Sequence, residues 1–158
     1  MTIVPITEKN LMAAAAVHAA AWRASHKTIC TSAFVAEHTT QRQARYLQQE
    51  AERGKKLWLL LDPEPAGLVS VGNDVIENLY VLPEKQGRGY GTALLRFAMS
   101  KCRRPTLWVL NSNQRAYQWY ERKGFVPTGA EKPLSGALYE CEMIYQEASP
   151  CALRHPGF

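Results

Sequence analysis

Cysteine is scarce in this sequence, and the few cysteines are scattered. Four occur in 158 residues, namely Cys30, Cys102, Cys141 and Cys151, and no two form a C-x-x-C pair. This spacing excludes the common zinc-binding and redox motifs, so we expect reduced thiols and no metal. The chain begins MTIVPITEKN, which lacks a basic segment followed by an apolar run. We therefore expect no secretory leader and a cytoplasmic protein.

Long apolar runs and a strong charge excess are also missing. No run approaches the ~20 apolar residues that span a bilayer, so we expect no membrane partner. The formal net charge of +5 suits an anionic ligand. It is too small and scattered to indicate a nucleic-acid partner. Apolar residues make up 46% of the chain, which is typical of a globular domain with its own core.

The pattern of apolar residues predicts a mixed α/β fold. Strands are predicted at residues 2–6, 56–61, 66–72, 75–82, 105–110, 138–146 and from residue 125 onward. Helices are predicted at residues 7–24, 33–53, 92–102 and 113–123. We expect a single domain over residues 1–148, with about six or seven mostly antiparallel strands and helices on both faces of the sheet. A C-terminal tail, residues 149–158, is expected at the surface.

A glycine-rich segment, QGRGYG at residues 86–91, joins the strand at 75–82 to the following helix. Glycines permit positive φ and a close approach of the backbone to a ligand. The start of a helix presents free N–H groups and a positive dipole end. Together these features predict a phosphate site, although a glycine-rich turn without a ligand is as good a reading of this segment alone.

Two widespread phosphate loops do not fit the segment. A P-loop ends in Gly-Lys-Ser/Thr, whereas Gly91 is followed by Thr92 and Ala93. A dinucleotide fingerprint needs the spacing G-x-G-x-x-G and an acidic residue about 20 positions later. Here Gly87, Gly89 and Gly91 alternate, and residues 106–111 contain no acid.

The pattern Gln86-x-x-Gly89-x-Gly91, preceded by LYVLP at residues 79–83, resembles the acetyl-CoA loop of the GNAT superfamily of N-acetyltransferases. A second half of that signature follows as Asn113-x-x-Ala116-x-x-x-Tyr120-Glu121-x-x-Gly124-Phe125. The resemblance covers about residues 75–127. It implies a single GNAT-like domain whose central strands, 75–82 and 105–110, splay apart beside acetyl-CoA.

The resemblance also implies which residues hold acetyl-CoA as the cosubstrate. The strand backbone would pair with the pantetheine arm, and the N–H groups after it would bind the pyrophosphate. Arg88 is equally well explained as a solvated surface arginine, and Asn113 as a helix cap. The implied contacts are Leu79, Tyr80, Val81, Gln86, Gly87, Arg88, Gly89, Tyr90, Gly91, Thr92, Asn113, Ala116 and Tyr120.

Two catalytic residues are predicted. Tyr120 would protonate the departing thiolate, since its phenol has a reference pKa of about 10. Glu77 is the candidate base, because strict alternation along the strand would place it on the same face as Leu79 and Val81. His26 or a relaying water is the alternative base, and an exposed strand charge is the structural alternative for Glu77.

The expected reaction is the transfer of an acetyl group from acetyl-CoA to a primary amine by direct attack in a ternary complex. A small-molecule acceptor is favoured over a protein or peptide N-terminus. Trp22, His26 and Phe34 are the candidate acceptor-binding residues. A non-catalytic acyl-CoA-binding or regulatory module is the alternative function. The oligomeric state is left open, and the tail could mediate a homodimer.

Overall fold

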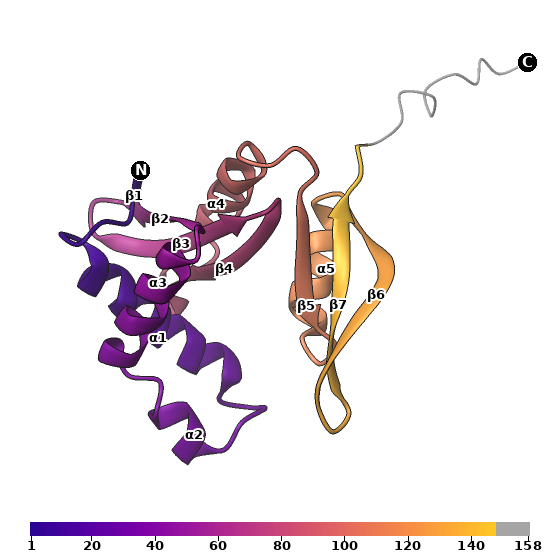
Figure 1. Cartoon of the computed structure of the whole chain (residues 1–158), viewed down its shortest axis with the longest axis horizontal. Coiled ribbons are helices and arrows are strands. Elements are labelled where there is room, and N and C mark those ends of the chain that lie inside the picture. The colour runs from indigo at the N-terminus through magenta and orange to yellow at the C-terminus, as the bar shows by residue number, and fades with distance from the viewer. Residues whose placement is uncertain (148–158) are drawn as a thin grey trace, which may run out of the picture. The chain divides into compact units, whose positions relative to one another are not determined.

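The computed structural model describes residues 1–147 of the chain (Figure 1). The chain divides into two compact units at the boundary between Arg103 and Arg104. The tail predicted at residues 149–158 lies outside the described residues.

The first unit is built on a four-stranded antiparallel sheet. Its strands follow in the order β1 (Thr2–Pro5), β2 (Lys56–Leu61), β3 (Pro65–Gly72) and β4 (Val75–Val81). Between β3 and β4, Asn73 and Asp74 both adopt positive φ, at 51° and 65°, which is typical of a tight two-residue hairpin turn. These strands agree closely with the predicted segments.

Helices cover both faces of this sheet. On one face lie α1 (Leu11–His26) and α3 (Thr40–Glu52), while the short α2 (Ser32–Ala36) lies beyond the end of α1, at the bottom of Figure 1. On the other face, Phe97 of α4 (Tyr90–Met99) packs edge-on against Trp58, with ring centroids 5.1 Å apart. A Cβ added at Gly67 would lie 2.9 Å from Leu94, so this glycine permits the close packing of α4.

The prediction of one helix over residues 33–53 is wrong, because two helices occupy this segment. Thr31 accepts a hydrogen bond from the N–H of Phe34 and begins α2, whereas Thr39 accepts one from Arg42 and begins α3. Threonine is a favoured N-cap because its hydroxyl satisfies a free N–H group of the first turn. The second cap therefore starts a new helix rather than continuing the first.

The second unit contains β5 (Thr106–Leu110), α5 (Gln114–Arg122), β6 (Phe125–Ser135) and β7 (Leu138–Tyr145). Strand β7 pairs antiparallel with both β5 and β6. Helix α5 packs against β6, and the buried side chains of this unit include Leu107, Val109, Phe125 and Met143. Gly124 follows α5 with φ of 96°, and an added Cβ would lie 2.9 Å from the ring of Tyr145.

Cys30, Cys102 and Cys141 are free thiols, and Cys151 lies outside the described residues. Within residues 1–147, no helix has the length and apolar character needed to cross a membrane.

Candidate active site

The glycine-rich segment forms an open cradle at the start of α4. Gly87 and Gly89 adopt positive φ of 75° and 85°, and a Cβ added to either would meet nothing within 4 Å. Gly89 is the N-cap of α4, and no side chain caps this helix. The first N–H groups of α4 therefore face open space at the positive end of the helix. This geometry fits a phosphate group.

Side chains of the same segment hold the cradle in place. Gln86 Nε2 donates to the carbonyl of Val81 at 3.3 Å, and Arg88 donates to the carbonyl of Glu84 at 3.4 Å. The Tyr90 hydroxyl donates to Asp62 at 2.8 Å. Gln86 and Tyr90 thus tie the cradle to neighbouring strands and turns. The Arg88 side chain is exposed beside it.

Strand β4 contains a bulge where the sequence predicts strict alternation. Glu77 pairs with Ser70, but the next pair on the same face of β3 joins Tyr80 to Leu68. From Glu77 to Tyr80 strand β4 therefore advances by three residues, while β3 advances by only two. Within this stretch Asn78 adopts a positive φ of 51°. Because of this extra residue, Glu77 and Tyr80 share one face, while Val81 points to the other. The predicted shared face of Glu77 and Val81 is wrong.

The carboxylate of Glu77 is engaged in an ion pair. Lys55 Nζ donates to Glu77 Oε2 and also to Glu50, whose side chain is only 3% exposed. Desolvation opposes the charge on Lys55, but the hydrogen bonds to both carboxylates prevail and raise the pKa of Lys55. Glu77 is therefore already partnered by a firmly charged lysine.

The predicted acceptor residues lie together at the end of α1. Trp22 stacks on His26 with ring centroids 4.0 Å apart, and Phe34 lies 6.0 Å from the Trp22 ring. The sequence did not single out His38, which stacks on Trp22 at 3.5 Å. Desolvation lowers the pKa of His26, although its hydrogen bond to the Trp22 carbonyl opposes this shift.

A polar network behind this cluster was also missed. His18 Nε2 lies 3.3 Å from Asn78 Oδ1, and the Tyr46 hydroxyl donates to the same oxygen at 3.2 Å. Asn78 Nδ2 donates to Ser70 Oγ at 3.0 Å, which identifies Oδ1 as the acceptor. Burial lowers the pKa of His18 to about 4, so the ring is neutral. The available signal was an asparagine in the middle of a strand, where this residue is disfavoured.

The second unit carries the other predicted residues on α5. Asn113 Oδ1 accepts a hydrogen bond from the N–H of Ala116 at 3.1 Å. Asn113 is therefore a helix cap, and its amide N–H₂ group is left for other partners. Tyr120 packs edge-on against Phe125, and burial raises the pKa of the Tyr120 phenol to about 12. Among the described residues of this unit, the Tyr120 hydroxyl has no hydrogen-bond partner.

Comparison with known proteins places this geometry in a family. The model of the GNAT acetyltransferase domain matches residues 34–127, which include β4, the glycine cradle and α5. Among curated proteins, none matches the sequence closely enough to count as a relative.

Several solved structures share the fold. YjaB from Escherichia coli, in its apo form, is 19% identical, with a TM-score of 0.68 over 93% of this chain and 98% of that chain. The PaiA N-acetyltransferase from Thermoplasma acidophilum, solved with coenzyme A, is 17% identical, with a TM-score of 0.66 over 90% and 98% of the two chains. A variant of the spermidine N-acetyltransferase SpeG from Vibrio cholerae is 17% identical, with a TM-score of 0.64 over 92% of this chain and 94% of that chain.

These structural similarities confirm the predicted GNAT-like α/β fold. The family match extends over more than half of the sequence and includes both motifs on which the resemblance was based. The chain therefore belongs to the GNAT acetyltransferase family.

Proposed function

We propose that this protein is an N-acetyltransferase that moves the acetyl group of acetyl-CoA to a primary amine. The observation that carries the proposal is the uncapped start of α4, with Gly87 and Gly89 open to an incoming anion. A diphosphate bound there would fix one end of the cosubstrate. The similarity to PaiA, which was solved with coenzyme A, supports the same ligand for this chain.

The proposed reaction is a direct transfer. The amine nitrogen attacks the thioester carbonyl, a C–N bond forms, and the C–S bond breaks with its electron pair on sulfur. The N–H of Val81 would stabilise the oxyanion, and Tyr120 would protonate the thiolate. The raised pKa of Tyr120 keeps the phenol protonated, as an acid must be. A phenol with a raised pKa is a weak acid, so it can protonate only a strongly basic thiolate. Desolvation around the departing sulfur would raise the pKa of the thiol in the same way and so make the thiolate more basic.

Removal of the amine proton is assigned to Glu77 acting through a water molecule. Lys55 occupies Oε2 of this carboxylate, so Oε1 is the oxygen proposed to accept the proton. A relay suits a carboxylate, which is a weak base toward an ammonium ion. His26 is the alternative base, since its lowered pKa leaves the ring neutral near pH 7.

A small-molecule acceptor is proposed, with a protein or peptide N-terminus as the alternative. Structures similar to this chain include a spermidine N-acetyltransferase and a protein titled ribosomal-protein-alanine N-acetyltransferase, from Brucella melitensis. Both kinds of acceptor therefore occur on this fold, and the choice depends on the residues around Trp22, where the acceptor is proposed to bind.

The second candidate is a non-catalytic module that binds acyl-CoA. The ion pair between Lys55 and Glu77 favours it, because a carboxylate held by a lysine is less available as a base. The two functions differ in one respect: the module would bind coenzyme A and release no product.

An acceptor screen separates them. The purified protein is mixed with acetyl-CoA and a panel of amines, amino acids and peptides, while free thiol is measured together with the mass of the products. We expect stoichiometric thiol release and a mass gain of one acetyl group on a free amine. Tight binding of coenzyme A without turnover on any acceptor would establish the binding module instead.

A further inference from the structure

A cavity of about 310 Å³ opens between α1, α3 and β4, entirely within the first unit. Its size lies at the lower end of the range for small-molecule sites. The residues that line it are His18, Trp22, His38, Arg42, Gln43, Tyr46 and Asn78. Of these lining residues, which all lie in the described part of the chain, none is acidic.

One wall of the cavity is aromatic and held in place. The rings of Trp22 and His38 stack at 3.5 Å with an interplanar angle of 13°. His38 is 7% exposed, and its Nδ1 lies 2.9 Å from the carbonyl of Phe34. Arg23 donates to the His38 carbonyl at 2.8 Å. His26 stacks on the Trp22 ring as well, at 4.0 Å, so His26 and His38 cover the two faces of the indole and its edge is left to line the cavity. An indole edge favours an aromatic group that packs edge-to-face against it.

The side chain of Arg42 places a positive charge at the same cavity. Arg42 lies in the first turn of α3, where the helix dipole adds partial positive charge. Its ion pair is one contact of 3.4 Å with Glu37, whose side chain is 65% exposed. Exposed pairs of this kind contribute little free energy, so a ligand carboxylate can replace Glu37. Arginine binds a carboxylate through two parallel hydrogen bonds, which also orients the ligand.

The inner end of the cavity has an unsatisfied acceptor. His18 Nε2 carries the proton, because Asn78 Oδ1 can only accept. His18 Nδ1 is buried and makes no hydrogen bond of good geometry with the residues described, while the side chain of Gln43, which also lines the cavity, interacts with the ring. A buried acceptor without a donor is unfavourable, so a donor on a bound molecule would stabilise this end of the cavity.

We propose that this cavity binds the acceptor and selects a primary amine that carries both a carboxylate and an aromatic side group, the chemistry of an aromatic α-amino acid. The carboxylate would pair with Arg42, the ring would pack edge-to-face against the exposed edge of Trp22, and the amine would remain near the bulge of β4. Polyamines are disfavoured, since no lining acid balances their charge. This inference rests on the proposed acetyl transfer and names its acceptor class.

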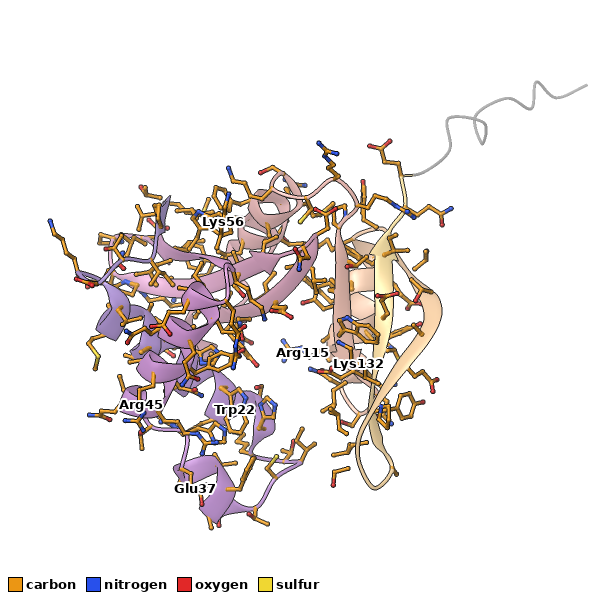
Figure 2. All side chains as sticks on the ribbon, viewed as in Figure 1. Trp22, Glu37, Arg45, Lys56, Arg115 and Lys132 are labelled. Atoms are coloured by element: carbon orange, nitrogen blue, oxygen red, sulfur yellow. The ribbon has the colours of Figure 1, made fainter. Side chains whose placement is uncertain are left out.

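Matched acceptor pairs test the inference. We expect kcat/KM for phenylalanine to exceed that for phenethylamine by at least about tenfold, since a charge-assisted hydrogen bond supplies this much. Arg42→Gln should abolish that preference. Arg45→Gln is the control, because Arg45 is exposed on the same helix and lies well apart from Trp22 (Figure 2). Trp22→Leu should abolish the preference for phenylalanine over leucine.

A binding measurement keeps this test separate from the proposed function. Phenylalanine added to the protein without acetyl-CoA should shift the indole N–H signal of Trp22 in the nuclear magnetic resonance spectrum. The shift should be lost in Arg42→Gln and kept in Arg45→Gln. If binding follows this pattern but no amine is acetylated, the cavity assignment stands and the acetyltransferase proposal fails. Equal turnover of spermidine and phenylalanine, a preference for peptide N-termini, or no indole shift would overturn the cavity assignment.

Discussion

Glu77 and Tyr80 point to the same face of the first-unit sheet, although three positions separate them. The cause is the bulge at Asn78, which places one extra residue of β4 opposite β3. Glu77 therefore faces the α1 and α3 side of the sheet, where Lys55 and Glu50 meet it. The bulge thus places the Glu77 carboxylate beside Lys55, on the sheet face that α1 and α3 cover.

Replacing Glu77 with glutamine tests its role as the base. If Glu77 removes the amine proton, Glu77→Gln should lower kcat by about 10²-fold or more, the usual contribution of general base catalysis. Glu50→Gln is the matched control, because it alters the other partner of Lys55. We expect that control to lower the midpoint of thermal unfolding while retaining most of the turnover. Equal kcat for the wild-type protein and Glu77→Gln would remove Glu77 from the mechanism.

Asn78 holds the bulge through its backbone and its side chain. Asn78→Ala should lower the free energy of unfolding by about 2–3 kcal/mol, because it combines lost hydrogen bonds with a side chain at positive φ. Asn78→Gly should cost less, since glycine adopts this φ freely. Denaturant titration of both variants measures the difference. Alanine proving as stable as glycine would show that the backbone at residue 78 is not constrained.

Tyr120 is predicted to act in chemistry rather than in binding. Tyr120→Phe keeps the packing against Phe125 and should lower kcat by roughly 10²-fold or more. The affinity for coenzyme A should change little. Tyr117→Phe, on the same helix, serves as the control with wild-type turnover. Initial rates of thiol release combined with coenzyme A titration check both quantities, and a Tyr120→Phe enzyme with full kcat would contradict the assignment.

His18 should make stability depend on pH. Its pKa is about 4 in the native protein, compared with 6.5 in an unfolded chain. Between these values the unfolded chain binds a proton that the native protein does not, so the free energy of unfolding falls as pH falls. The loss reaches up to about 3 kcal/mol by pH 4. Urea titrations at pH 7 and pH 5 should show a smaller decrease for His18→Gln; the same decrease in both proteins would contradict the buried neutral histidine.

The regular elements and the cradle could be predicted because their signals are local. The glycines of residues 86–91 require positive φ, the turn at Asn73 and Asp74 has matching chemistry, and apolar runs locate the strands. Trp22 and Phe34 were likewise predicted to belong to one acceptor site, and their ring centroids lie 6.0 Å apart in the structure.

The network around Asn78 could not be predicted, because it depends on contacts between distant segments. Alternation along β4 assumes a regular strand, and the sequence alone does not reveal the bulge that breaks it. The separation of His18, Tyr46 and Asn78 along the chain likewise hides their hydrogen bonds. Thr39 is a favoured N-cap residue, but the prediction of one helix over residues 33–53 did not use this signal.

Binding of coenzyme A at the start of α4 tests the central claim most directly. Calorimetric titration should show one molecule of coenzyme A bound per chain, with affinity lost in Gly89→Ala and retained in Gly54→Ala. Both glycines adopt positive φ with open space around them, so the two substitutions impose similar backbone strain, and only the first places a methyl group in the cradle. Equal affinity in the two variants, or no binding to the wild-type protein, would contradict the account.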